Sequence, residues 1–381
     1  MLISRIVLKN WRNFRAIDVA LSDRVFIVGA NASGKSNFLD ALRFLREIAK
    51  PGGGLQSSLS QRGGLSKVRC LSARKDPDVE IEVEISEPAT DIVWRYAIGL
   101  EQQVRGNRFP ILKYEKVWKD GKLILDRPDS ADRKDELRLT QTHLEQINSN
   151  AEFREVAKFL ESIRYLHLVP QLLRSSEIYK SPAVPDDPYG RNFLELVART
   201  PEKTRRSRLK KIEAALRQAV PQMRDLTDTK DEAGIPHLEV LYEHWRPKAG
   251  RQQEDQFSDG TLRLIGLFWA LLDGDSPLLL EEPELSLNAA IVKRLPALFY
   301  QLHRKRSSQV FVTTHSWELL SDKGVGAEEV ILLTPSPEGT RAQVASARKE
   351  IRALLEAGLS IGEAALPYTV PSSLEQFELF S

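Results

Sequence analysis

The stretch VFIVGANASGKSNFLDAL, from Val25 to Leu42, decides the fold. A short run of β-prone apolar residues leads into a glycine-rich turn, and a helical pattern of apolar residues follows the turn. The turn fits the phosphate-binding pattern G-x-x-x-x-G-K-[S/T] at every position, from Gly29 to Ser36. A strand, a phosphate loop and a helix in this order favour a nucleotide-phosphate site over an ordinary glycine-rich turn.

Each part of this turn has a physical role in phosphate binding. Backbone N–H groups of the turn and of the helix start point at phosphate oxygens, and Gly29 and Gly34 let the backbone curl closely around them. Lys35 would place its charge on the β- and γ-phosphates, and Ser36 would offer a hydroxyl to Mg²⁺. The residues predicted to contact the nucleotide here are Gly29, Asn31, Ala32, Ser33, Gly34, Lys35, Ser36 and Asn37.

The composition is that of an ordinary globular protein. The chain has 381 residues, of which 41% are hydrophobic and 28% charged, and its formal net charge of +2 gives no global signal for nucleic acid or membrane. No apolar run approaches the length that spans a bilayer, and the charged start does not fit a signal peptide. The one cysteine, Cys70, excludes an intramolecular disulfide and is expected to be a buried small side chain. We expect a cytoplasmic protein.

The N-terminal part of the chain reads as antiparallel β-structure. Residues 2–28 form strand-like runs, and Asp78–Ile85 alternates strictly between apolar and acidic residues, which is typical of a half-exposed strand. Asp120 and Gly121 give a hairpin-turn signal between two further runs. These patterns predict an antiparallel β-subdomain.

The middle of the chain changes to helical patterns from about Leu137. Leu144–Ile163 reads as one or two amphipathic helices, and three prolines make Ser175–Gly190 a loop. Arg191–Val220 returns to helix, and Ile235–Trp245 fits a strand. We therefore expect a mostly helical insertion.

After Gln256 the chain becomes apolar again. Leu262–Leu272 is apolar almost all round, which predicts a buried helix. Apolar strands follow at Pro277–Glu281, Gln309–Ser316 and Glu329–Pro335. Strands that alternate with helices predict an α/β fold with a mainly parallel sheet and a ligand site at the carboxyl ends of its strands.

Two of these strands end in residues that suit ATP hydrolysis. Glu281 leaves the sheet where it could hold Mg²⁺ directly or through water, and Glu282 could polarise the attacking water. Adjacent carboxylates at a strand end are costly unless a cation faces them, although a surface acidic turn is the alternative. His315 ends the next strand and could bond the γ-phosphate, whereas a lone histidine is more often structural.

A second helix start carries anion-binding features. Ser258 is a good N-cap for the buried helix, and Gly260 would let a phosphate approach the backbone. Plain helix capping is the alternative. One nucleotide needs only one phosphate loop, so a second site makes sense if it closes on ATP bound to another subunit.

Together these motifs resemble the ABC-type ATPases, and specifically the SMC/RecF/OLD-like branch. The matching stretches, in the order of that family, are GANASGKS, FSDGT, LLLEEPE, LSLN and TTHS, and the opening RIVLKNWRNF resembles the start of this branch. The resemblance covers residues 1 to about 50 and 255 to 335, and the middle of the chain poorly. It implies an ABC-type ATPase head with a mixed sheet, an N-terminal antiparallel β-subdomain and a mostly helical insertion.

The resemblance also implies how the residues act. Two ATPs would be held head to tail between two protomers, with Ser258 and Gly260 of one at the γ-phosphate bound by Lys35 of the other. Arg12 matches a position near the nucleotide in relatives. Asp259 departs from the family's usual glycine, and because an acid repels a phosphate, we expect this side chain to point away.

The same resemblance assigns the chemistry. Catalysis would fall to Glu282, His315 and Lys35, and Ser36 and Glu281 would hold Mg²⁺, so that ATP and Mg²⁺ are the expected cofactors. Glu281 stands where the family more often has aspartate.

The domain organisation follows from the same comparison. Residues 1–104 and 251–345 would form the two halves of one ATPase domain, 105–250 an inserted β/helical subdomain, and 346–381 a C-terminal tail. The acid cluster of the nuclease domain in OLD-type relatives is not seen after His315, so any nuclease is expected to be a separate protein.

Three functions are open at this stage. The first is an ATPase, at least dimeric around ATP, that acts as a scaffold or switch for a separately encoded nuclease or toxin, in bacteriophage defence. The second is a RecF-like repair clamp that binds DNA through local basic runs, although such runs are more often solvated helix faces. A membrane-transporter subunit is disfavoured by the KNWRNF start and the long insertion. The basic runs are Arg205, Arg206, Arg208, Lys210 and Lys211, and Arg304, Lys305 and Arg306.

Overall fold

The computed structural model divides into two compact units, which are described separately below. The first unit contains Met1–Ile163, Ser276–Leu279 and Pro296–Ser381, and the second contains Arg164–Asp275 and Leu280–Leu295. The domain bounds expected from the sequence stay a prediction. The structure describes residues 1–381 except 74–75, 88–89, 104–108, 175–186, 244–249 and 371–381.

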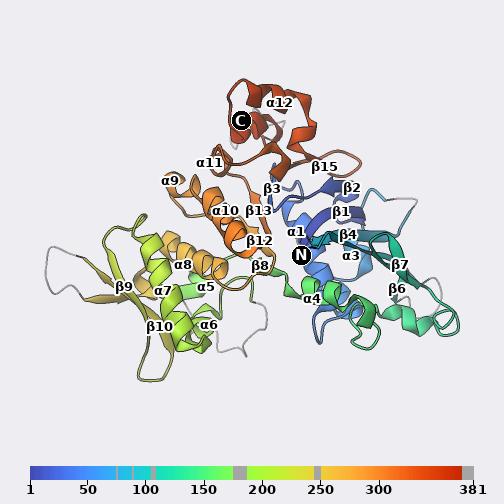
Figure 1. The fold of residues 1–381 in the computed structure, drawn as a ribbon, viewed down its shortest axis with the longest axis horizontal. Coiled ribbons are helices and arrows are strands. Elements are labelled where there is room, and N and C mark those ends of the chain that lie inside the picture. The colour runs from blue at the N-terminus through green and yellow to red at the C-terminus, as the bar shows by residue number, and fades with distance from the viewer. Residues whose placement is uncertain (74–75, 88–89, 104–108, 175–186, 244–249, 371–381) are drawn as a thin grey trace, which may run out of the picture. The chain divides into compact units, whose positions relative to one another are not determined.

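The first unit begins with an antiparallel sheet in the order β2-β1-β4-β5-β6-β7 (Figure 1). Buried and partly exposed residues alternate along β4, as its sequence predicts. Asp120 and Gly121 turn the chain between β6 and β7 with φ values of 49° and 77°, as in a tight hairpin. The predicted antiparallel β-subdomain is confirmed. Its strands are β1 (Leu2–Trp11), β2 (Phe14–Ala20), β4 (Val79–Glu87), β5 (Ile92–Gln102), β6 (Pro110–Lys119) and β7 (Lys122–Arg127).

The second sheet is mixed, and the strands that the first unit contributes to it run in the order β15-β14-β3-β13-β12, of which only Leu278 and Leu279 of β12 belong to this unit. β3 is parallel to β13 on one side and to β14 on the other, and β15 is antiparallel to β14. All residues of β3 are buried, which explains the unbroken apolar run from Val25 to Val28, and its first residue, Arg24, is a buried arginine that pairs with Glu329. The carboxyl ends of β3 and β13 therefore meet at one edge. The strands are β3 (Arg24–Gly29), β12 (Leu278–Glu281), β13 (Val310–Thr314), β14 (Val330–Thr334) and β15 (Arg341–Val344).

Helix α1 (Lys35–Ala49) packs against both sheets of the first unit. The ring of Phe44 lies 5.2 Å from that of Trp11 in β1, and Phe38 makes an edge contact at 6.3 Å with Phe14 in β2. The helix also contacts β3 and β13 of the second sheet. Because α1 begins directly after the phosphate loop, this packing fixes the helix start in place.

One predicted helix of the first unit is shorter than the sequence indicates. Only Arg154–Ser162 (α4) of the expected Leu144–Ile163 is an α-helix, and turns precede it. The N–H groups of His143 and Leu144 donate to the buried carboxylate of Glu115, and the chain from residue 143 to residue 149 forms bends and turns. The remaining helices are α2 (Leu55–Gln61), α3 (Leu65–Val68), α10 (Leu295–Arg306), α11 (Trp317–Leu320), α12 (Lys349–Glu356) and α13 (Ile361–Ala365).

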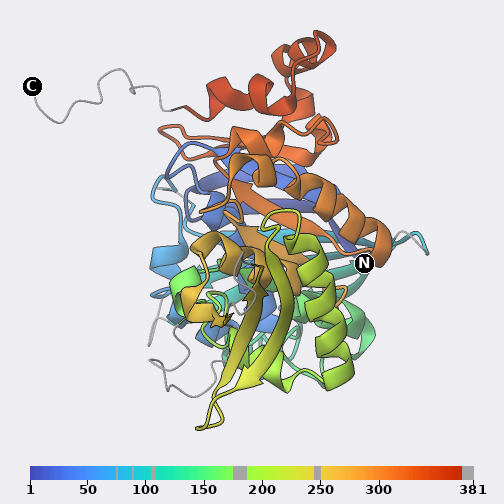
Figure 2. The same ribbon diagram turned by 90° about the vertical axis from the view of Figure 1, so that its left-hand side faces the viewer.

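The second unit joins helices to a three-stranded sheet in the order β11-β10-β9, which α7 covers (Figure 2). The helices expected in Arg191–Val220 and the strand expected from Ile235 are confirmed as α6, α7 and β10. The loop expected at Ser175–Gly190 lies mostly outside the described residues. The elements are β8 (Arg164–Leu166), α5 (Pro170–Arg174), α6 (Phe193–Arg199), α7 (Glu202–Leu216), β9 (Met223–Lys230), β10 (Pro236–Tyr242), β11 (Arg251–Gln253), α8 (Asp259–Leu271) and α9 (Ala289–Val292).

Helix α8 forms the core of the second unit. It is apolar almost all round and packs against α5 and α7, as its sequence predicts. Trp269 makes an edge contact at 6.0 Å with Phe193 of α6, and Arg208 of α7 lies over the same indole. Within the described residues, no helix has both the length and the apolarity needed to cross a membrane.

Candidate functional site

The phosphate loop has the backbone of a phosphate cradle. The chain leaves β3 at Gly29, and Ala32 and Gly34 have positive φ values of 60° and 99° before α1 begins at Lys35. The side chain of Lys35 folds over the loop, and its Nζ donates to the carbonyl oxygens of Gly29 at 3.1 Å and Ala30 at 3.2 Å. The ammonium group therefore lies where the loop would surround a phosphate.

Both glycines of the loop are required by close packing. A Cβ atom at Gly34 would lie 2.1 Å from Nδ2 of Asn13, and one at Gly29 would lie 2.6 Å from the carbonyl oxygen of Leu333. Gly34 also has a φ that side chains rarely allow. Glycine was expected at these positions so that the backbone could approach a phosphate, and its close approach to protein atoms is a second reason.

Asn13 is a site residue that the sequence argument missed. It lies in the turn between β1 and β2, and its Nδ2 donates to the carbonyl oxygen of Ser33 at 2.8 Å and to Oγ1 of Thr340 at 2.7 Å. Its Oδ1 accepts from Nδ2 of Asn37 at 2.9 Å. One amide thus ties the phosphate loop and the first turn of α1 to the N-terminal hairpin. The only sequence signal was its place in the stretch WRNF.

His315 lies beside the phosphate loop, as the sequence argument expects. It follows directly after β13, whose carboxyl end neighbours that of β3. Its Nδ1 is 3.5 Å from Nζ of Lys35, and its side chain is exposed. The structure therefore brings Lys35, His315 and the loop together within one unit.

Arg12 lies beside the helix that follows the phosphate loop. Its guanidinium pairs with Asp40 of α1 at 3.1 Å, and Arg62 pairs with the same carboxylate at 2.7 Å. Burial alone would raise the pKa of Asp40, but the hydrogen bond and charge of Arg62, with the charges of Arg12 and Arg43, lower this pKa below its ordinary value. A contact between Arg12 and a nucleotide stays a prediction.

The paired acids lie in the second unit, at the end of β12. Glu281 is the last residue of the strand, and its Oε2 accepts a hydrogen bond from the hydroxyl of Tyr165 in β8. Nδ1 of His167 is 4.0 Å from the same oxygen. Glu282 follows with a left-handed backbone φ of 44°, which turns the chain out of the strand. Tyr165 and His167 were not expected from the sequence.

Arg263 is a further residue near the acids whose role was not expected from the sequence. It belongs to α8 and is only 6% exposed, although helix interiors rarely bury arginine. Its Nε has no hydrogen-bond partner within the described ranges. Burial lowers the pKa of its guanidinium, although the negative charges of Glu284, Asp259 and Glu282 act in the opposite direction and raise it. The helix of the FSDGT stretch therefore places a positive charge toward the acids.

The start of α8 combines capping with a close backbone approach. Oγ of Ser258 accepts from the N–H of Thr261 at 3.2 Å, so the plain capping role is present. A Cβ at Gly260 would lie 2.7 Å from the carbonyl oxygen of Ser286, which gives this glycine a packing reason of its own. Contacts of Ser258 and Gly260 with a phosphate stay predictions.

Asp259 is held by two side chains of its own unit. Its carboxylate accepts from Arg174 at 2.7 Å and from Gln171 at 2.8 Å. Arg174 also donates to the carbonyl oxygen of Phe257 at 2.7 Å. The acid that departs from the family pattern therefore has a cation beside it, which offsets its repulsion of an anion.

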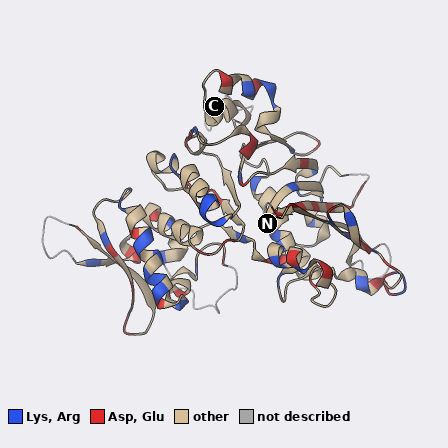
Figure 3. Ribbon diagram, in the orientation of Figure 1, with Lys and Arg blue, Asp and Glu red and all other residues tan. Residues whose placement is uncertain are grey.

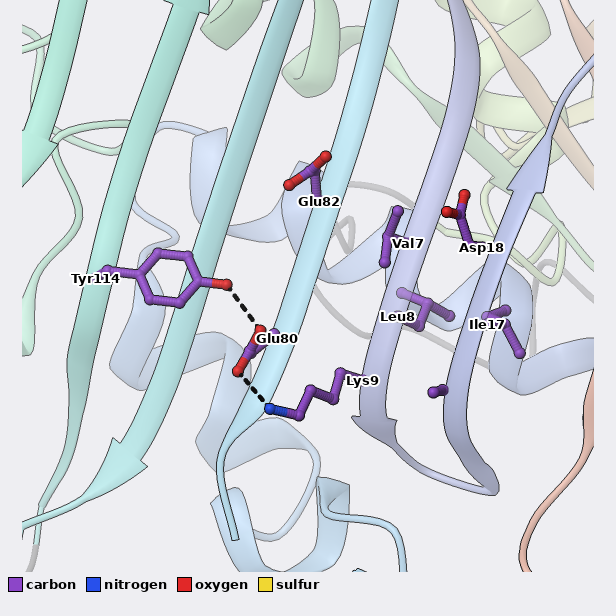
Figure 4. A pocket seen from close by; sticks show the side chains of 9 residues that line it. Val7, Leu8, Lys9, Ile17, Asp18, Glu80, Glu82 and Tyr114 are labelled. Carbon is purple, nitrogen blue, oxygen red and sulfur yellow. Dashed lines mark hydrogen bonds and ion pairs between the residues drawn. The ribbon is translucent and has the colours of Figure 1, made fainter. Parts of the chain in front are cut away.

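The outer face of the N-terminal sheet carries a separate hollow of about 320 Å³ (Figure 4). Glu80 lies at its centre, where it accepts from Tyr114 at 3.0 Å and from Lys9 at 2.9 Å. Glu82 and Asp18 also line the hollow. Acids and bases there pair with one another, so the hollow does not offer the net positive charge that a nucleotide phosphate needs.

Comparison with known proteins agrees with this geometry. A family model described as AAA domain, putative AbiEii toxin, Type IV TA system, and named AAA_21, matches residues 24–321, which is more than half of the chain. The chain belongs to the AAA_21 family. The matched range contains the phosphate loop, the paired acids and His315.

Solved structures of SMC heads share the fold of this AAA_21 protein. One is the SMC head bound to the C-terminal winged-helix domain of ScpA, with a TM-score of 0.52 and 15% identity over 90% of this chain and 97% of the other. Another is the SMC head of Pyrococcus furiosus with an extended coiled coil, with a TM-score of 0.51 and 15% identity over 93% and 99%. The α/β fold of an ABC-type ATPase head, predicted from the sequence, is therefore confirmed.

A short segment of this AAA_21 protein also resembles a curated enzyme. It is 48% identical over 54 residues to Endonuclease GajA of Bacillus cereus (strain VD045). The match spans 14% of this chain and only 9% of the endonuclease. It agrees with the resemblance to the OLD-like branch.

Proposed function

We propose that this AAA_21 protein binds ATP with Mg²⁺, hydrolyses it, and dimerises around it to control a separately encoded effector. The observation that carries the proposal is the position of Lys35. Its Nζ lies over the carbonyl oxygens of the loop and 3.5 Å from Nδ1 of His315. A cation, a ring of backbone N–H groups and a histidine at one sheet edge form the electrostatic half of a phosphoryl-transfer site.

The oxygen ligands in the chain suit Mg²⁺. Ser36 offers a hydroxyl and Glu281 a carboxylate, and Mg²⁺ prefers such hard oxygen donors together with phosphate oxygens. When bound, Mg²⁺ would neutralise charge on the β- and γ-phosphates. Glu282 would orient and deprotonate the attacking water, and His315 would bond the γ-phosphate.

Dimerisation is part of the proposal because the chain has two anion-binding helix starts. Lys35 begins one helix and Ser258 caps the other. A nucleotide held by the first in one protomer would be closed by Ser258 and Gly260 of the second. Hydrolysis would then open the dimer, and the dimer state is what an effector could read.

Two variants test this function. Lys35→Ala removes the phosphate charge and should abolish ATP binding in calorimetry, whereas Lys349→Ala, on the distant α12, should bind as the wild type does. Glu282→Gln keeps the shape of the side chain but removes the base, so turnover should fall by about 10²- to 10⁴-fold while ATP traps a dimer in light scattering. If Glu282→Gln hydrolysed ATP at the wild-type rate, the role of Glu282 would be wrong.

The effector is proposed to be a nuclease or toxin in bacteriophage defence. The support is the family description, which names a toxin of a toxin–antitoxin system, and the partial likeness to an endonuclease. The test expresses this chain with each adjacent gene product and measures toxicity in cells. A toxic neighbour that Glu282→Gln keeps bound and silent supports the switch, and independence of every neighbour contradicts it.

Helix α7 favours a second candidate, an ATP-dependent DNA clamp. Lys203, Lys210 and Lys211 are exposed on this helix, whose surface is rich in basic residues (Figure 3). Phosphate contacts by such residues would make binding fall steeply with salt, by a slope of about −0.9 per neutralised phosphate. Absence of duplex binding at low salt with ATP would remove this candidate.

A further inference from the structure

His315 lies on a short connection between two elements of the first unit. Strand β13 and helix α11 are separated by only two residues, His315 and Ser316. His315 is exposed, and its Nδ1 lies 3.5 Å from Nζ of Lys35, at the far end of hydrogen-bond distance. A small displacement of the backbone would therefore make or break this contact.

The hydroxyl of Thr314 holds the first half of this connection. Its Oγ1 accepts a hydrogen bond from the backbone N–H of Ser316 at 2.9 Å, which closes a turn around His315. Thr314 is fully buried and ends a strand whose residues are all buried. The acceptor is therefore fixed by the sheet, and the N–H group that it binds belongs to the residue directly after the histidine.

Ser316 holds the second half of the connection. Its Oγ accepts from the N–H of Leu319 at 3.2 Å, so this side chain caps α11. Helix α11 in turn packs closely on α13, where a Cβ atom at Gly362 would lie 2.7 Å from the carbonyl oxygen of Trp317. The backbone on both sides of His315 is thus tied to buried or closely packed structure.

Such ties matter because His315 is exposed. An exposed side chain depends on its backbone for its position more than a buried one does, since close packing restrains it less. A catalytic group that is misplaced by about 1 Å can lose about 10²-fold in rate. The turn around His315 is therefore a point where the loss of one hydrogen bond should reach the chemistry.

We propose that Thr314 is a positioning residue that holds His315 at the phosphate site by accepting the N–H of Ser316. The inference rests on the proposed ATPase function and deepens it, because it adds a residue that acts on the γ-phosphate through the histidine. The residues of this arrangement all belong to the first unit. In the stretch TTHS, only the histidine has been given a role so far.

The first test measures turnover and ATP binding separately. Thr314→Val keeps the branched shape and removes the acceptor, so kcat should fall about fivefold while the Kd for ATP in calorimetry stays within about twofold. Thr314→Ser keeps the hydroxyl and should restore kcat. Thr334→Val, at the end of β14 on the other side of β3, is the matched control and should leave kcat unchanged. The Oγ1 of Thr334 is buried and has no hydrogen-bond partner within the described part of the chain.

A double-mutant cycle shows whether Thr314 acts through the histidine. His315→Ala should lower kcat by about 10²-fold, as the loss of one transition-state donor does elsewhere. Adding Thr314→Val to His315→Ala should then change kcat by less than about twofold. An equal fall in both backgrounds overturns the positioning role. Thr314→Ala also lacks the acceptor and needs less space, so it carries the same predictions if Thr314→Val folds poorly.

Nuclear magnetic resonance follows the histidine without turnover. The full chain is labelled on its 6 histidines, and the spectrum of His315→Ala identifies the His315 signal. Mg²⁺ and AMP-PNP should shift this signal in the wild type and in Thr314→Ser, and much less in Thr314→Val. The Thr314 variants should melt within a few degrees of the wild type.

The outcomes separate this inference from the function on which it rests. A wild-type kcat in Thr314→Val, or a His315 signal that shifts there as in the wild type, overturns the role of Thr314 and leaves the ATPase proposal standing. A wild-type chain that binds AMP-PNP without moving the His315 signal overturns the role of His315, and the inference with it. A chain that binds no nucleotide overturns the proposed function.

Discussion

The phosphate loop (Gly29–Ser36) and the acid turn (Glu281–Glu284) are held in place by different means. In the phosphate loop, backbone conformation and crowding fix the geometry, since no side chain fits at Gly34 and one amide, that of Asn13, holds the loop from outside. In the acid turn, side chains contact side chains, as Tyr165 does with Glu281. A backbone cradle is either formed or lost, whereas side-chain contacts can exchange one partner for another. Substitutions should therefore act abruptly in the loop and gradually around the acids.

The largest contrast is expected between two glycine variants. Gly34→Ala places a Cβ 2.1 Å from Nδ2 of Asn13 at a φ of 99°, so nucleotide binding should be lost and the free energy of unfolding should fall by about 2–4 kcal/mol. Gly260→Ala places a Cβ 2.7 Å from the carbonyl oxygen of Ser286, but Gly260 has a φ that alanine can adopt. The free energy of unfolding should therefore fall by only about 1–2 kcal/mol. Calorimetry and urea unfolding measure both.

The two glycine variants also distinguish the proposed role of the start of α1 in ATP binding from that of the start of α8 in dimerisation. Gly260→Ala should still bind ATP as a monomer but form fewer ATP-dependent dimers. An equal loss of ATP binding in Gly34→Ala and Gly260→Ala would contradict the proposed difference between the phosphate loop and the start of α8.

The second prediction concerns the amide that holds the loop. Asn13→Ala removes hydrogen bonds to Ser33, Thr340 and Asn37, and each such bond contributes about 0.5–1.5 kcal/mol. We expect about 2–3 kcal/mol less stability and about tenfold weaker ATP binding. Thr340→Ala removes one of these bonds and should have about a third of the effect. If Thr340→Ala matched Asn13→Ala, the loop would not depend on the other two bonds.

Local patterns predicted the loop, the strands and the buried helix because their causes lie close together in sequence. Val25–Gly29 is unbroken and apolar since both faces of β3 are covered, and the glycine spacing follows from the turn. The fold class could be assigned because these patterns alternate. The helix expected from Leu144 is wrong in its first half, where the chain forms turns and Glu115, far away in sequence, accepts from the N–H groups of His143 and Leu144.

Two of the residues that were missed, Asn13 and Tyr165, act across long sequence separations. Asn13 reaches Thr340, and Tyr165 reaches Glu281, so neither contact leaves a spacing that a pattern could reveal. Arg263 looked like an interruption in an apolar helix, and its significance depends on which acids face it. Motifs predict which atoms could meet a ligand, but the residues that hold those atoms are set by tertiary packing.

The third prediction extends the comparison to buried charge beside the loop. Asp40 has a pKa lowered below its ordinary value, about 3.9, chiefly by Arg62 acting against burial. A carboxyl whose pKa is lower in the folded state than in the unfolded state stabilises the folded protein at pH values above its unfolded-state pKa. This stabilisation is lost as the pH falls through the folded-state pKa. Asp40→Asn should cost about 2–3 kcal/mol at pH 7, because charge-assisted bonds from Arg12 and Arg62 are lost.

Unfolding as a function of pH checks the Asp40 prediction. The difference between the wild type and Asp40→Asn should be constant from pH 7 to about 5 and shrink below about pH 4. Asp126→Asn, in a pair whose carboxylate is more than half exposed, serves as the control and should change stability little. A difference that grew toward acid pH would contradict the assigned direction.

The smallest effect is expected at the partly exposed pair of Arg174 and Asp259 in the second unit. Because both side chains are about one third exposed, Arg174→Met should cost less than about 1 kcal/mol in stability. It leaves Asp259 without its nearest cation at the helix start proposed to meet the γ-phosphate, so ATP-dependent dimerisation should weaken about three- to fivefold at low salt and less at high salt. Asp259→Asn in the Arg174→Met background should restore it, since the repulsive charge is gone. If the double variant dimerised as poorly as Arg174→Met, the packing of the arginine side chain would matter more than its charge. The start of α8 would then depend on packing, as the phosphate loop does.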